Sequence, residues 1–270
     1  MMERVRRPAV AGSFYPASPR ELRAFLSRVV SPVRERVRAT AVVSPHAGYV
    51  YSGSTAAAVF SKVIVPDTLV VVGPNHRGWG EPYAVSTHDG WQTPLGIIPV
   101  DREFTALLCE KSRFLKPDAS AFAAEHSLEV QIPFIQYANP SASLVAICLQ
   151  GTPRDPAFEE IGAAVAAAIR EKGKETLIVA SSDMTHYEPR RSAERKDRTA
   201  LEAICALDSQ LLVERIEEMD ISMCGFGPVL VAIAAAKALG ARSGEVVAYA
   251  TSGDVTGDDE VVGYAGVLIR

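Results

Sequence analysis

The chain has 270 residues, a net charge of −4 and 48% hydrophobic residues. A chain of this length forms one large α/β domain or two small ones, and its composition is that of an ordinary globular protein. Because acidic and basic residues are interspersed, nucleic acid is excluded as the main partner. The longest apolar stretch, residues 229–239, is too short to cross a bilayer, and the N-terminus lacks the apolar core of a signal peptide. We therefore expect a cytoplasmic protein with no membrane partner.

Helical and strand patterns alternate along the chain. A capping box marks the first helix, with Ser18 at the N-cap, Pro19 at the first helical position and Glu21 three residues after the cap. Further helices are predicted over residues 54–64 (capped by Ser52 or Ser54), 102–112, 126–137, 156–172, 190–206, 208–219 and 226–239. Strands are predicted over residues 41–44, 68–72, 97–100, 143–149, 176–181, 246–251 and 261–269. This order predicts an α/β fold with a mostly parallel sheet and helices on both faces.

Nothing in the composition divides the chain into parts. It has no Ser/Gly-rich or charged linker, so we predict a single domain over residues 1–270. The Gly- and Pro-dense stretch 73–99, which carries Trp79 and Trp91, is expected to be an excursion at the edge of the sheet or over the site. The acidic segment 254–260 reads most simply as a solvated turn, since its spacing matches no EF-hand calcium loop.

Three of the five histidines stand just past the ends of predicted strands. His46 follows the run 41–43, His76 the run 69–72, and His186 the run 177–180. In open α/β sheets, ligands bind beyond the carboxyl ends of the strands. Taken alone, His46 and His76 are equally well explained as turn histidines bonded to backbone. Their repetition favours a metal site, because neutral imidazole is the commonest protein ligand for metals.

The other two histidines carry less weight. His126 precedes Glu129 by three residues, so on a helix the two side chains share a face that can bind metal; a solvated capping cluster explains them equally well. His88 is predicted to lie in a surface turn. For His186, the carboxylate of Asp183 three residues earlier can orient the ring as a general base. The alternative is that Asp183 caps a helix, and we favour the functional interpretation.

Cys224 stands apart from the other three cysteines. The chain has no CxxC pair, and in a reducing compartment all four are expected to be thiols. Cys224 precedes the apolar helix 226–239, where the positive end of the helix dipole is expected to lower its pKa toward thiolate. A thiolate coordinates metal or attacks an electrophile. A Cys224–His186 nucleophilic pair would give His46 and His76 no function, so we favour metal binding.

Six motifs resemble those of the Memo family. They are residues 7–16 (RPAVAGSFYP), 45–49 (PHAGY), 73–76 (GPNH), 125–129 (EHSLE), 181–187 (SSDMTHY) and 224–225 (CG). Memo proteins are similar to class III extradiol dioxygenases, which are non-haem iron enzymes, and this implies a three-layer αβα sandwich around the sheet. The resemblance also implies that His46, His76 and Cys224 hold a metal. It places His126 and His186 in the pocket as catalytic residues, with Asp183 beside them.

The dioxygenases have a carboxylate as third ligand, whereas this chain has a cysteine. Two imidazoles and a thiolate form a softer donor set, suited to Fe(II) first and also to copper or zinc. The resemblance therefore does not imply that this protein cleaves aromatic rings. The first hypothesis is a redox-active metalloenzyme in which His186 transfers protons. The second is a non-catalytic metal-handling or phosphopeptide-binding protein that uses the same cleft. The ligand in either case is a small molecule or a peptide.

Overall fold

The computed structural model describes residues 4–31, 33 and 35–270, and its centre is an eight-stranded sheet. The strand order is β11-β13-β2-β9-β3-β8-β4-β7. The strands span Gly244–Thr251 (β11), Gly263–Ile269 (β13), Ala41–Ser44 (β2), Thr176–Ser181 (β9), Thr68–Pro74 (β3), Ser143–Leu149 (β8), Tyr83–Ser86 (β4) and Lys116–Asp118 (β7). The four central strands, β2, β9, β3 and β8, are parallel, as predicted. Antiparallel pairs flank them on both sides.

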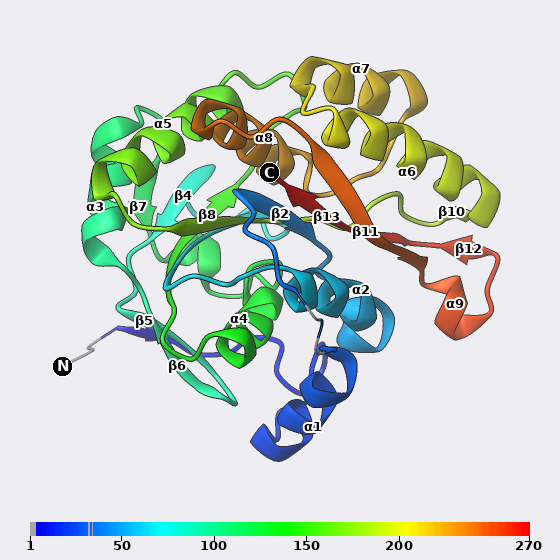
Figure 1. The fold of residues 1–270 in the computed structure, drawn as a ribbon, viewed down its shortest axis with the longest axis horizontal. Coiled ribbons are helices and arrows are strands. Elements are labelled where there is room, and N and C mark those ends of the chain that lie inside the picture. The colour runs from blue at the N-terminus through cyan, green and yellow to red at the C-terminus, as the bar shows by residue number, and fades with distance from the viewer. Residues whose placement is uncertain (1–3, 32, 34) are drawn as a thin grey trace.

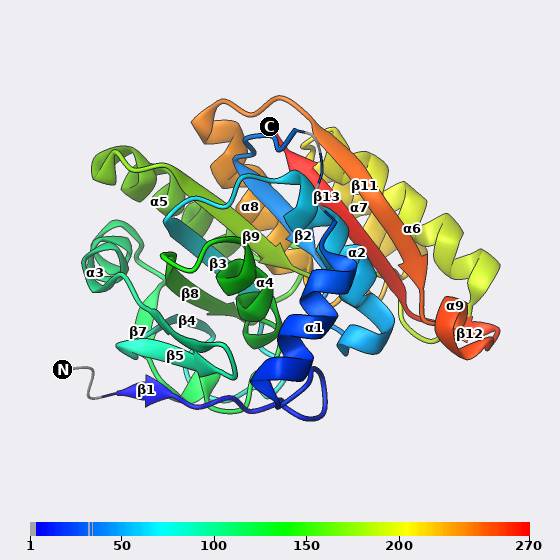
Figure 2. The same ribbon diagram turned by 60° about the horizontal axis from the view of Figure 1, so that its bottom comes forward.

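Helices cover both faces of this sheet (Figures 1 and 2). One face carries α3 (Arg102–Lys111), α5 (Ala157–Lys172), α6 (Arg190–Cys205), α7 (Ser209–Met219) and α8 (Phe226–Leu239). The other carries α1 (Pro19–Val29), α2 (Tyr49–Lys62) and α4 (Ile132–Ala138). The three-layer α/β architecture is therefore confirmed. The single domain over residues 1–270 stays a prediction. Among the described residues, no helix is both long and apolar enough to span a membrane.

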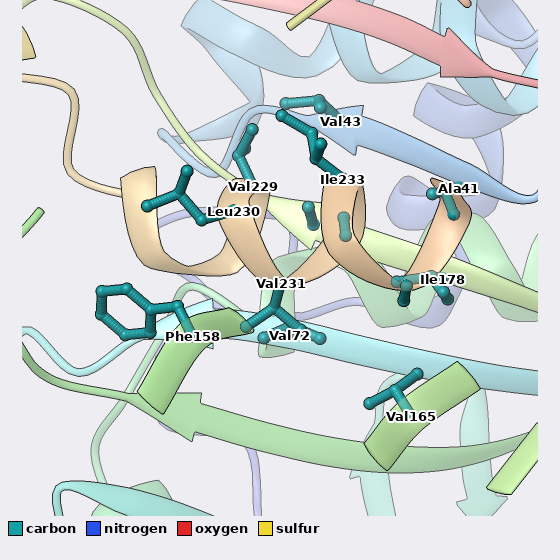
Figure 3. Packing of buried hydrophobic residues seen from close by; sticks show 14 of the residues in the cluster. Ala41, Val43, Val72, Phe158, Val165, Ile178, Val229, Leu230, Val231 and Ile233 are labelled. Carbon is teal, nitrogen blue, oxygen red and sulfur yellow. The ribbon is translucent and has the colours of Figure 1, made fainter. Parts of the chain in front are cut away.

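The apolar residues of the central strands form the core together with the helices that pack on them. Figure 3 shows how α8 packs over the central strands, with Val231 beside Val72 and Ile233 beside Val43. Strands β2 and β3 are buried from end to end, and β9 is buried after its first residue, which explains their runs rich in β-branched residues. Burying one such side chain contributes about 1.5–3 kcal/mol. The parallel strands are thus fixed rigidly, and so are the loops that leave their carboxyl ends.

Smaller elements complete the fold. A second sheet has the order β1-β5-β6 (Val5–Arg6, Gly90–Thr93, Gly96–Pro99), and β10 (Glu188–Pro189) pairs with β12 (Glu260–Val261). The helix α9 spans Gly253–Thr256, and two short 3-10 helices span Ser120–Phe122 and Glu129–Gln131. The stretch 73–99 therefore supplies one strand of the main sheet and a hairpin beside it. In the hairpin, the buried ring of Trp91 lies under the Arg6 guanidinium at 4.3 Å.

Three predicted boundaries were wrong. The helix after His46 begins at Tyr49 with Gly48 as its N-cap, and the Ser52 hydroxyl donates to the Ala47 carbonyl instead of capping. The helix predicted from residue 126 begins only at Glu129, as a 3-10 turn that leads into α4. The last strand is divided into β12 and β13.

Candidate metal centre

The site lies at the carboxyl edge of the parallel strands. His46 follows β2, His76 follows β3, and Asp183 and His186 follow β9, which lies between those two strands. His126 comes from the loop before the 3-10 helix Glu129–Gln131. Because the strands are parallel, their carboxyl ends bring these loops to one place. The strand ends therefore meet as the sequence predicts.

Three histidines form a group that could hold a metal ion. One ring nitrogen from each of His46, His76 and His126 lies within 4.8 Å of the other two. The rings of His76 and His126 are stacked with centroids 4.6 Å apart, and the His46 ring stands edge-on to both. His126, which the sequence places in the pocket, thus joins the two histidines predicted to be ligands.

The hydrogen bonds of Ser181 determine the tautomer of His46. The Ser181 hydroxyl donates its single proton to the Ser127 carbonyl at 2.6 Å and accepts a hydrogen bond from Nε2 of Gln131 at 2.8 Å. Its remaining lone pair, 2.9 Å from Nδ1 of His46, can only accept. Nδ1 of His46 therefore carries the proton, and Nε2 presents a lone pair to the other histidines. Burial lowers the pKa of His46, and the neighbouring histidines lower it further.

Glu125 orients the other two rings. Its Oε1 atom lies 2.9 Å from Nδ1 of His76 and 3.4 Å from Nδ1 of His126. Burial raises the pKa of Glu125, but the hydrogen bond and charge of His76 outweigh it and hold the pKa at about 2. Burial also lowers the pKa of His126 to about 4. Both rings thus turn Nδ1 to an ionised carboxylate and leave Nε2 for a ligand, the arrangement common behind metal-binding histidines.

Cys224 adjoins the histidine group at His46. Its Sγ lies 3.1 Å from Nε2 of His46 and 3.7 Å from the Asp183 carbonyl. The backbone before α8 is close to β9, since a Cβ atom on Gly225 would lie 2.4 Å from the Ser181 carbonyl. The expected fall in the thiol pKa was wrong. Burial and the Asp183 carboxylate raise the pKa of Cys224, and they outweigh the helix end.

Asp183 faces His46. Its Oδ1 accepts hydrogen bonds from the backbone N–H groups of His46 at 2.7 Å and Ala47 at 3.4 Å, and burial raises its pKa to about 7. The ring of His186 instead donates from Nδ1 to the Ser222 carbonyl at 2.9 Å. The interpretation that Asp183 orients His186 is therefore replaced, because the loop turns the two side chains in different directions.

Glu129 is engaged away from the histidines. Its carboxylate forms a buried ion pair with Arg6 at 2.6 Å and accepts hydrogen bonds from the Tyr15 hydroxyl and from the backbone of residues 9 and 10. Neither interpretation that the sequence left open for His126 and Glu129 was right: residues 126–128 are not helical, so the two do not pair on one helix face, and the buried Glu129 is not part of a solvated cluster. Glu129 ties the N-terminal segment to the loop that carries His126.

The histidine group opens into a pocket of about 860 Å³. Phe14 packs on the ring of His126, with centroids 4.7 Å apart, and His186 and Asp183 also line the space. His88 lies elsewhere, beside Ser86 and Trp91, as a histidine without a role in the site. The residues that sequence reasoning missed are Glu125, Ser127 and Gln131. Glu125 and Ser127 lie in the motif 125–129 and Gln131 lies two residues beyond it, and they carried no other signal.

Comparisons with known proteins show the family to which the chain belongs. The family model described as Memo-like protein matches residues 6–268. A MEMO1 family protein of Archaeoglobus fulgidus is 45% identical and one of Methanopyrus kandleri is 43% identical, each over 98% of this chain and nearly all of its own length. An uncharacterised protein of Escherichia coli K12 shares the fold with a TM-score of 0.59 and 17% identity, over 86% of this chain and all of its own. The chain therefore belongs to the Memo family.

Proposed function

We propose that this protein binds a first-row transition metal through His46, His76 and His126, with Cys224 as a fourth donor beside His46. The observation that carries the proposal is the group of three ring nitrogens within 4.8 Å of one another, on three histidines that line one pocket. His46 and His76 are the ligands expected from the sequence. Three imidazoles and a cysteine sulfur can bind Fe(II), copper or zinc, and we propose Fe(II) as the metal.

The second part of the proposal is that the centre is redox-active. Fe(II), when bound, supplies one-electron chemistry and reactivity toward O₂. His186 is the proton-transfer group, because Nδ1 donates to the Ser222 carbonyl and leaves Nε2 as a base at the pocket wall. Burial lowers the pKa of His186, so its ring is neutral and able to accept a proton at neutral pH. Asp183 holds the backbone of His46 in place.

Metal content tests the ligand set. Protein stripped with a chelator is loaded anaerobically with Fe(II), desalted and subjected to elemental analysis. We expect about one iron per chain in the wild type and a loss in His46→Ala, His76→Ala, His126→Ala and Cys224→Ser. His88→Ala and Cys109→Ser serve as controls, because they remove the same side-chain types away from the pocket. Unchanged iron in both His46→Ala and His76→Ala would overturn the proposal.

Oxygen consumption tests turnover separately. The iron-loaded protein is offered a panel of catechols and other small aromatic compounds, and O₂ uptake is followed with an electrode. Uptake that disappears in His186→Gln, while iron content stays, supports the enzyme. Iron binding without uptake across the panel favours a metal-handling protein instead.

A further inference from the structure

One wall of the pocket is acidic. Residues 252–262 run from α9 through β12 at the end of β11 (Figure 2), and Asp258, Asp259 and Glu260 from this segment line the pocket. All three are exposed to solvent. We call these three residues the acidic lip. They line the same pocket as His46, His76 and His126, so a ligand bound in that pocket shares it with the acidic lip.

Nothing nearby neutralises the acidic lip. Arg190, at the start of α6, pairs its guanidinium with Asp254 at 2.7 Å and donates only a backbone N–H to the Asp259 carbonyl of the lip. Within the described part of the chain, the three lip carboxylates have no ion-pair partner, and the pocket lining has no lysine or arginine. Asp183 adds a fourth carboxyl group deeper in the pocket. A cleft lined by one sign of charge attracts ligands of the opposite sign.

Aromatic rings in the same pocket are an independent observation. Phe14, Tyr51, Tyr187 and Tyr264 all contribute to the lining. Tyr187 is 78% exposed and has a positive φ of 53°, which is unusual for a residue other than glycine. The neighbouring backbone is held in this conformation by hydrogen bonds from His186 N to Ser222 and from Thr185 N to Asp197. Ring faces attract organic cations, and ring surfaces bury apolar groups.

We propose that the pocket selects an organic cation: a small molecule with an aromatic or apolar body and an ammonium group. The ammonium lies at the acidic lip, the body packs against the tyrosines, and the far end reaches the three histidines. A pocket of about 860 Å³ has room for a ligand of this size. Phosphopeptides are disfavoured, because the carboxylates of the acidic lip repel phosphate groups. The orientation toward the histidines rests on the proposed metal function, whereas the charge selection does not.

Three ligands that differ mainly in charge test the selection. Tyramine, tyrosol and 4-hydroxyphenylacetate carry an ammonium, a hydroxyl and a carboxylate on the same type of aromatic body. Their affinities for the metal-free full-length protein are measured by ligand-observed NMR in low-salt buffer with chelator. We expect tyramine to bind about tenfold more tightly than tyrosol, and 4-hydroxyphenylacetate to bind more weakly than either.

Two triple variants locate the effect. In Asp258→Asn/Asp259→Asn/Glu260→Gln, the preference for tyramine over tyrosol is expected to disappear. In the matched control Glu21→Gln/Glu110→Gln/Glu159→Gln, which removes three exposed carboxylates away from the pocket, the preference is expected to remain. The inference is overturned if tyrosol or the anion binds as well as tyramine, if none of the three binds, or if the lip variant keeps the preference. Because chelator is present throughout, these results do not depend on whether the histidines hold a metal.

Discussion

Nδ1 of His76 and Oε1 of Glu125 lie 2.9 Å apart, although 49 residues separate them in the chain. The same oxygen lies 3.4 Å from Nδ1 of His126. The second oxygen of Glu125 accepts a hydrogen bond from the backbone N–H of His76 at 2.7 Å. One fully buried carboxylate thus sets the orientation of two rings and of the loop that carries one of them.

Replacing Glu125 by glutamine is expected to weaken metal binding about 10- to 100-fold. The amide oxygen can still accept from one ring, but the negative charge that raises ligand basicity is lost. The measurement is a competition titration with a chromophoric chelator. Glutamine also presents an N–H group to donors, so we expect a loss of about 1–3 kcal/mol in the free energy of unfolding. Unchanged affinity in a folded variant would show that Glu125 does not support the ligands.

Ser181→Ala is expected to destabilise the protein by about 1–3 kcal/mol, because it leaves the buried Nδ1 of His46 without its acceptor and removes one of the acceptors of the Gln131 amide. Ser44→Ala is the matched control. Its hydroxyl is also buried at the end of a parallel strand, but it has no hydrogen-bond partner among the described residues, so its removal is expected to be neutral. Urea unfolding of both variants measures the difference. Equal losses of unfolding free energy in the two variants would contradict the hydrogen bonds assigned to Ser181.

Asp197→Asn is expected to change the pH dependence of stability. Burial raises the pKa of Asp197, so its folded carboxyl keeps a proton to higher pH than the unfolded chain does. The wild type therefore loses stability as the pH rises above the unfolded pKa toward the folded one, and the variant does not. Relative to the wild type, the variant therefore gains stability as the pH rises from about 4, the ordinary pKa of an aspartate, toward the raised pKa of the folded protein. Urea unfolding across this range checks the sign, and a gain toward low pH would contradict it.

Arg6→Met is expected to cost about 3–5 kcal/mol of unfolding free energy, because it leaves the buried carboxylate of Glu129 without its cation. The double variant Arg6→Met/Glu129→Gln removes both charges and is expected to recover part of this loss. Thermal and urea unfolding of the two variants test the difference. If the double variant is less stable than the single one, the ion pair is not the source of the effect.

The sequence predicted the parts of the site that depend on strand ends. Buried runs such as 69–72 define parallel strands, and parallel strands place their following residues at one edge, so His46 and His76 were found without coordinates. The side chains between them could not be assigned in the same way. Whether Asp183 faces His46 or His186 depends on loop dihedrals that no periodicity encodes.

The pKa of Cys224 and the imidazole partners of Glu125 could not be predicted from the sequence for a different reason. A helix terminus lowers a thiol pKa by a local effect, whereas the burial that raises the pKa of Cys224 comes from chain segments far apart in sequence. Glu125 carried no distinguishing signal beyond its neighbour His126, because its two imidazole partners meet only in the folded protein. Boundaries of helices such as α2 and α4 were wrong for local reasons of capping and turn geometry.

The position of β2 in the sheet has a consequence for how the protein is made. This early strand lies between β9 and β13, whose residues are translated more than a hundred positions later. During synthesis, β2 and the loop that carries His46 therefore lack both neighbouring strands of the sheet until β9 and β13 have left the ribosome. Non-local pairing of this kind slows folding, and it places the capture of any cation after synthesis rather than during it.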